Sequence, residues 1–110
     1  MSLERIFKAL VSLGLSQTEV RVYFQIVTKG PTTVRSLTHD SSFSKRQLYR
    51  CLNSLQNKSI IVTDNKHPKE FSAIPFEDVL DRLIKQKNEQ AQNIRKRKKE
   101  LVNNWKERRK

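Results

Sequence analysis

The last third of the sequence most limits what this chain can fold into. After Pro75 it contains neither glycine nor proline, the two residues that most often end a helix. Glu77, Asp78 and Asp81 lie in its first turns, where acidic side chains complement the helix dipole. The stretch therefore predicts one helix that runs nearly to Lys110.

Along this helix, apolar positions recur in steps of four and three, which is a heptad spacing. At 1.5 Å per residue the spaced positions span roughly 37 Å, which is more than a small core can cover. Its first turns, with Val79, Leu80 and Leu83, are expected to pack on the first helix. The rest needs a partner, and the same helix of a second copy is the simplest one; the alternative is a frayed basic tail. The expected dimerisation residues are Leu80, Ile84, Lys87, Ala91, Ile94, Lys98, Leu101 and Trp105, with the two lysines as polar interruptions.

The preceding residues predict the order helix, helix, short helix, helix, strand, strand. Ser16 and Glu19 fit a capping box at the start of the second helix, whose apolar stripe is Val20, Tyr23, Phe24 and Val27. The predicted helices cover residues 3–13, 16–30, 32–38 and 44–58, with a polar turn at 39–43 and strands at 60–63 and 70–74.

Two helices joined by a tight turn and followed by a hairpin describe a winged helix-turn-helix. The expected fold class is mainly α with a small β-hairpin (α+β), a winged helix-turn-helix followed by a long C-terminal helix. Residues 1–76 would form the DNA-binding domain and residues 77–110 the basic dimerisation helix.

In such a fold the helix at 44–58 enters the DNA major groove. Leu48, Cys51, Leu52 and Leu55 form its buried stripe, so the basic and amide side chains on its other side point away from the core. The alternative is that these side chains are only solvated. With the turn, the preceding helix and the wing at 64–70, the expected DNA-binding residues are Thr33, Arg35, Ser42, Ser44, Lys45, Arg46, Gln47, Tyr49, Arg50, Asn53, Lys66, His67 and Lys69.

The net charge of +12 favours a polyanionic partner, with nucleic acid first and an anionic membrane surface second. Residues 85–110 hold 11 basic and 3 acidic residues, a net charge of +8, so most of the excess lies there. The run Arg95–Lys99 is either a solvated face or a non-specific contact to DNA phosphates.

Other classes of protein find little support in the sequence. Cys51 is the only cysteine, which predicts a reducing compartment, and no signal peptide or membrane span is evident. His39 and His67 lie in different turns without a nearby nucleophile. We therefore expect that the protein is not an enzyme and that it binds no cofactor, metal or membrane. We expect it to be cytoplasmic and nucleoid-associated.

Several segments keep a characteristic order and spacing over some 70 residues: 13–16, 19–23, 30–31, 44–49, 52–55, 58–61, 73–75 and 77–80. Together they resemble the TrmB-like family of archaeal winged-helix transcriptional regulators. The resemblance implies DNA binding through Ser44–Asn53 and dimerisation through the helix after Pro75. Ser59 stands where the family usually has glycine, so strain is expected there. The sequence stops where sugar-sensing members continue into an effector domain, so no small-molecule effector is expected.

The function expected from these features is sequence-specific binding of double-stranded DNA by a homodimeric transcriptional regulator. Two recognition helices would enter successive major grooves about 34 Å apart. Two alternatives stay open at this point. One is a chromatin-like protein that coats DNA with little sequence preference, and the other is a winged-helix adaptor that docks on proteins of the transcription machinery.

Overall fold

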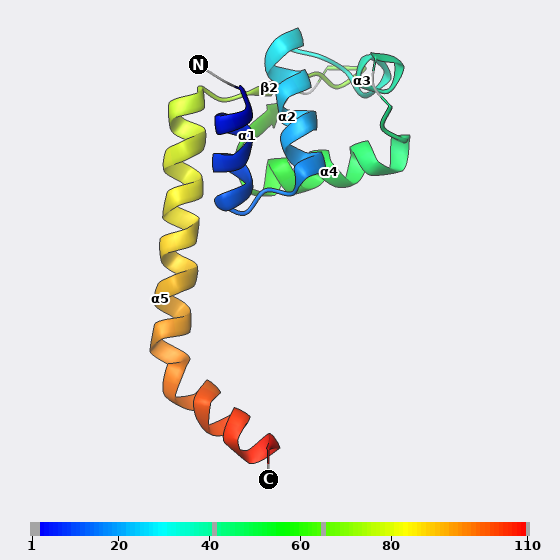
Figure 1. Ribbon diagram of the computed structural model, residues 1–110. Helices are drawn as coiled ribbons and strands as arrows, with labels where there is room; N and C mark the ends of the chain where they lie inside the picture. Colours follow the sequence, from blue (N-terminus) through cyan, green and yellow to red (C-terminus); the bar gives the residue numbers. More distant parts are fainter. Residues whose placement is uncertain (1–2, 41, 65, 110) are drawn as a thin grey trace.

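A computed structural model describes residues 3–40, 42–64 and 66–109. The small helices and the hairpin gather at one end of a long last helix (Figure 1). This arrangement is a winged helix-turn-helix with a long C-terminal helix, which confirms the predicted fold class. In chain order the elements are α1 (Leu3–Ser12), α2 (Gln17–Lys29), α3 (Val34–Asp40), α4 (Lys45–Asn57), β1 (Ile61–Thr63), β2 (Phe71–Ala73) and α5 (Phe76–Arg108).

Capping boxes fix the first residues of α2 and α4. The hydroxyl of Ser16 accepts a hydrogen bond from the backbone N–H of Glu19 at 3.0 Å, and the Glu19 carboxylate accepts one from the backbone N–H of Ser16 at 2.9 Å. Ser44 and Gln47 make the same two bonds at 3.1 Å each at the start of α4. Each box satisfies two backbone donors that a helix start otherwise leaves unpaired.

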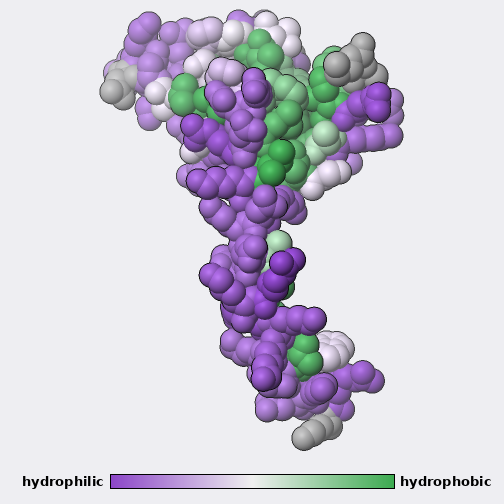
Figure 2. Space-filling view, turned by 90° about the vertical axis from the view of Figure 1, so that its left-hand side faces the viewer, coloured by the Kyte–Doolittle hydropathy of each residue, from purple (hydrophilic) through white to green (hydrophobic). Residues whose placement is uncertain are grey.

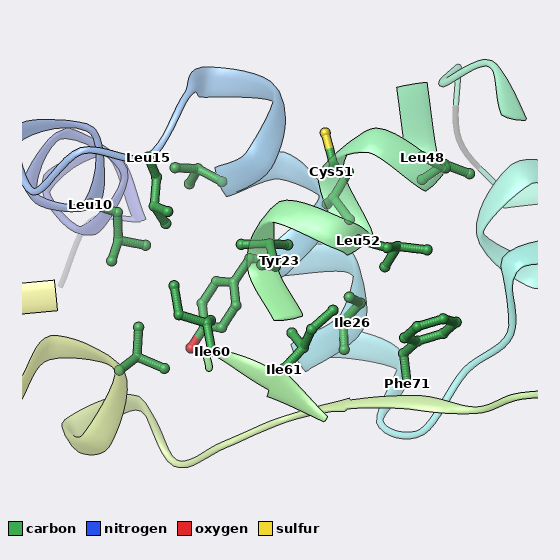
Figure 3. Close-up of a cluster of buried hydrophobic side chains, with 14 of the residues drawn as sticks. Leu10, Leu15, Tyr23, Ile26, Leu48, Cys51, Leu52, Ile60, Ile61 and Phe71 are labelled. Atoms are coloured by element: carbon green, nitrogen blue, oxygen red, sulfur yellow. The ribbon is translucent and has the colours of Figure 1, made fainter. Parts of the chain in front are cut away.

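The core lies where α2 and α4 cross over the hairpin (Figure 3). The predicted buried stripe of α4 is confirmed, with Leu48 and Leu55 fully buried. The predicted stripe of α2 is partly wrong, because Val27 is 52% exposed and Val22 and Ile26 are buried instead. The reason is that α2 contacts α1, α4 and β2, so its buried face is wider than a single stripe predicts.

The hairpin is antiparallel, with Ile61 opposite Ala73 and Thr63 opposite Phe71. A third segment pairs with it, because Thr32 and Phe71 exchange backbone hydrogen bonds of 3.0 and 2.7 Å. Thr32 lies just before α3, so this bridge ties the wing to the start of the helix-turn-helix. The sequence patterns had predicted Thr32 only as the first residue of the helix at 32–38.

α4 ends in a Schellman motif that leads directly into the hairpin. The backbone N–H of Ile60 donates to the carbonyl of Leu55 at 3.0 Å, and that of Ser59 donates to the carbonyl of Gln56 at 2.9 Å. Ser59 has a φ of 61°, in the left-handed region that favours glycine. The strain expected from a serine at this position is therefore present.

α5 begins in the core and then leaves it. Val79 and Leu83 are buried in the same cluster as Leu10 of α1. One turn further, Lys87 passes over the loop between α1 and α2, where its Cε lies 3.6 Å from the position that a Cβ on Gly14 would take. From Lys87 to Arg109 every residue is exposed. The helix extends well beyond the domain (Figure 1) and gives the molecule its long dimension of 55 Å against 31 and 27 Å.

Candidate nucleic-acid interface

The outer face of α4 is open and positively charged. Arg46, Arg50 and Asn53 are all exposed, on the side opposite the buried leucines. Within the described ranges, neither arginine forms a salt bridge with an acidic side chain. Both guanidinium groups are therefore available to a ligand outside the chain. Arginine presents a planar array of donors that matches phosphate oxygens and the major-groove edge of guanine.

A groove of about 830 Å³ runs beside this face, between α3, the first turns of α4 and the wing. Its floor is apolar, with Val34 and Phe71, and its rim carries basic side chains from all three walls. Six of the predicted DNA-binding residues line it, and they come from three segments that are distant in sequence: Thr33, Arg35, Lys45, Tyr49, His67 and Lys69.

The wing between the strands is held in shape by Asp64. Its Oδ1 accepts hydrogen bonds from the backbone N–H groups of Glu70 at 3.1 Å and of Lys66 at 3.2 Å. The hydrogen bond from Glu70 lowers the pKa of the Asp64 carboxyl most. The hydrogen bond from Lys66 and the Lys66 charge lower this pKa further. The Nζ of Lys66 also lies 3.7 Å from the Glu70 carboxylate, so part of its charge is already neutralised. His67 and Lys69 remain exposed at the rim of the groove.

Three further predicted residues lie at the start of α4. Ser42 is exposed in the turn before the helix, whereas Ser44 and Gln47 are the two partners of the capping box. The Oε1 of Gln47 accepts from both the backbone N–H and the hydroxyl of Ser44, at 3.1 and 3.4 Å. Gln47 therefore stabilises the start of α4. Of its side chain, only the amide N–H groups take no part in the capping box.

Sequence reasoning missed His39 as a residue of this surface. It had placed the end of the third helix at Thr38 and a turn from His39, but α3 continues to Asp40 and His39 lines the groove. The available signal was its position four residues after Arg35, which puts the two on one helix face. The prediction that residue 41 belongs to the turn concerns a position outside the described residues.

A buried ion pair fixes α4 against α2. Glu19 is only 8% exposed, and its Oε2 accepts hydrogen bonds from the Ser54 hydroxyl at 2.6 Å and from Lys58 Nζ at 3.0 Å. Burial alone would raise the pKa of Glu19, but the bonds from Ser54, Ser16 and Lys58 together with the Lys58 charge outweigh it and lower that pKa. The pair joins residues 39 positions apart and sets the direction in which α4 presents its arginines.

The described residues offer little to other kinds of site. No cluster of three or more His, Cys, Asp or Glu side chains within them is placed to hold a metal ion. None of their helices combines the length and apolar character that spanning a membrane requires. Cys51 is buried, and this burial raises the pKa of its thiol. The negative charge of Glu19 raises the pKa further, so the reactive thiolate is disfavoured.

The fold and the exposed, positively charged face of α4 define a winged-helix protein. Residues 10–77 match the family described as sugar-specific transcriptional regulator TrmB, so the chain belongs to the TrmB family. This finding confirms the resemblance noted from the sequence motifs.

Two individual proteins are similar to this chain. One is the uncharacterized protein MJ1503 of Methanocaldococcus jannaschii, with 26% identity over an 89-residue alignment that covers 76% of this chain and 67% of that protein. The other is the solved structure of TrmBL2, titled an archaeal chromatin protein with a novel mode of DNA binding. It superposes with a TM-score of 0.78 at 23% identity over 96% of this chain, which shows a shared fold. The chain spans 42% of the length of that structure.

Proposed function

We propose that this protein binds double-stranded DNA as a homodimeric transcriptional regulator, with the helix Lys45–Asn57 in the major groove. The observation that carries the proposal is the exposure of Arg46 and Arg50, unpaired within the described residues, on the face of α4 opposite its buried leucines. The major groove of DNA is about 12 Å wide and admits a helix of this kind. Arginine reads guanine there through paired hydrogen bonds.

In this proposal the DNA backbone lies along the groove beside α4. Arg35 and Lys45 on two walls and Lys69 on the third supply positive charge to a phosphate-bearing strand. Phosphate contacts contribute affinity and register, whereas the arginines and Asn53 of α4 contribute the choice of bases. Membership of a family of transcriptional regulators supports this assignment.

The second copy would bind along α5. Ile94, Leu101 and Trp105 are apolar, belong to the predicted heptad seam, and are between 42% and 63% exposed in the single chain. Figure 2 shows small apolar patches on the otherwise hydrophilic surface of this helix. Pairing two such helices buries these side chains and spaces the two winged domains for successive turns of one duplex.

Charge reversal on α4 tests the DNA-binding claim. A protein with Arg46→Glu and Arg50→Glu is expected to lose at least about 100-fold in affinity for a short duplex, since two favourable contacts become repulsive. The matched control reverses two exposed arginines on α1 and α2, Arg5→Glu and Arg21→Glu, and keeps most of the affinity. Equal losses in both proteins indicate binding through net charge alone, and no loss in either indicates that α4 does not contact the duplex; both outcomes contradict the proposal.

A second candidate function is coating of DNA with little sequence preference. The observations that favour it are the net charge of +12 and the structural similarity to a chromatin protein. Selection of bound fragments from random DNA, followed by footprinting, separates the two functions. Protection of one palindromic site indicates a sequence-specific regulator, and uniform protection along any duplex indicates a coating protein.

A further inference from the structure

The free end of α5 carries a concentration of positive charge that the proposed major-groove contact does not use. Residues 95–109 include eight basic and two acidic residues, a net charge of +6, and all are exposed. Within this segment of the described chain, the ion pair between Arg97 and Glu100, at 3.9 Å, is the only one. Figure 2 shows the predominantly hydrophilic surface of this end of the helix.

The charges are arranged around the heptad seam. With 3.6 residues per turn, Leu101 and Trp105 lie within about 20° of Ile94 on the helix circumference. Arg95, Lys99 and Lys106 lie about 100 to 140° to one side, and we call these three residues the basic ridge. Pairing of two helices through the seam therefore leaves the basic ridge facing solvent.

The basic ridge needs an anionic partner to relieve its own repulsion. Arg95 and Lys99 are one helical turn apart, where like charges destabilise a helix. The ridge extends roughly 16 Å along the axis, and a duplex carries one negative charge about every 1.7 Å. A helix that lies in a membrane surface buries an apolar face, but on this helix the exposed apolar residues Ile94, Leu101 and Trp105 are those that the proposed dimer uses. A duplex is therefore the better match.

The ridge is also remote from the recognition helix. The last contact of α5 with the winged domain noted above is at Lys87, and from there to Arg108 the helix continues for roughly 32 Å. The free end of α5 is therefore far enough from α4 to contact DNA other than the duplex that α4 holds (Figure 1).

We infer that the basic ridge of α5 is a second DNA-binding surface, which holds the phosphate backbone of another duplex and makes the protein a bridge between two DNA segments. The inference rests on the proposed function for the first duplex. It adds a contact that is independent of base sequence, because lysine and arginine on phosphates read no bases.

A capture assay tests the bridge. A biotinylated duplex is immobilised, the protein is added, and the capture of a fluorescent free duplex is measured at 100 mM salt. The ridge variant Arg95→Gln, Lys99→Gln, Lys106→Gln is expected to capture about tenfold less of the second duplex and to bind a single duplex within about threefold of the original affinity. The matched control, Arg5→Gln, Lys8→Gln, Arg21→Gln, removes three exposed charges from α1 and α2 and keeps the bridging.

Helix content and dimer mass of each variant are measured first, and the charge-conserving variant Arg95→Lys, Lys99→Arg, Lys106→Arg is expected to bridge like the original protein. Full bridging by the ridge variant overturns the inference, as does an equal loss in the matched control. Binding of the original protein to phosphatidylserine vesicles, lost in the ridge variant while bridging stays unchanged, assigns the ridge to a membrane and also overturns it. If the Arg46 and Arg50 reversal leaves single-duplex binding intact while the ridge variant abolishes it, the proposed function of α4 fails and the ridge stands as the DNA site.

Discussion

The Nζ atom of Lys58, at the end of α4, lies 3.0 Å from Oε2 of Glu19, at the start of α2. The Ser54 hydroxyl donates to the same carboxylate oxygen at 2.6 Å. The side chains proposed to read DNA need a helix with a fixed direction, and this contact joins α4 to the helix that crosses it. The pair is largely buried, with 11% of the Glu19 side chain and 27% of the Lys58 side chain exposed, so solvent screens it little.

Replacing Glu19 by glutamine is expected to lower the free energy of unfolding by about 1–3 kcal/mol, because Lys58 loses its counter-charge and remains partly buried. Urea unfolding at neutral pH measures the change. The comparison is Glu100→Gln, which breaks the exposed contact with Arg97 on α5 and is expected to cost less than about 0.5 kcal/mol. Similar losses in the two proteins would mean that the Glu19 pair contributes no more than a surface contact.

The same carboxylate gives the fold a dependence on pH. The folded pKa of Glu19 is lowered below its ordinary value of 4.5. A lowered acid pKa stabilises the folded state fully above the unfolded value, and this stabilisation is lost as the pH falls through the folded pKa. The stability difference between the original protein and Glu19→Gln is therefore expected to shrink when unfolding is measured at pH 3 instead of pH 7. A difference that stays constant or grows on acidification would contradict the assigned role.

Ser59 offers a stabilising substitution. Its φ of 61° costs a residue with a side chain about 1–2 kcal/mol, part of which glycine recovers. Glycine is more flexible than serine in the unfolded chain, which offsets part of this gain. The free energy of unfolding of Ser59→Gly is therefore expected to rise by about 0.5–1 kcal/mol. Ser59→Ala keeps the strain and serves as the comparison in the same urea titration. A glycine protein no more stable than the alanine protein would show that the left-handed conformation costs little here.

Trp105 is the only tryptophan and reports directly on the proposed dimer. Ile94→Gln with Leu101→Gln is expected to convert a particle of twice 13.0 kDa into one of 13.0 kDa in light scattering, and to shift the Trp105 emission to longer wavelength. Both follow from the loss of apolar contacts in the heptad seam. The control, Asn93→Gln with Asn104→Gln, changes the same helix outside the seam. A monomeric original protein with fully solvated Trp105 fluorescence would rule out pairing through this helix.

Local patterns in the sequence predicted much of this fold. The spacing of Leu48, Cys51, Leu52 and Leu55 identified the buried side of α4, and the serine and glutamate of a capping box located the start of α2. Such signals act within one or two turns, where neighbours in sequence are also neighbours in space.

Contacts between distant segments were not predictable in the same way. The backbone bridge from Thr32 to Phe71 and the Glu19–Lys58 pair each join residues about 39 positions apart, and no periodicity in one segment encodes its partner. For the same reason His39 was missed, because the groove it lines exists only once α3, α4 and the wing are packed together.

The most direct test of the account is a map of the residues that respond to DNA. A short duplex is titrated into isotopically labelled protein at low salt, and backbone amide shifts are followed by solution NMR. The largest changes are predicted over Ser44–Asn53 and at Lys66–Lys69, with little change on α1. Changes confined to α1 and α5, with the amides around Arg46 and Arg50 unaffected, would contradict the claim that α4 is the face that meets the major groove.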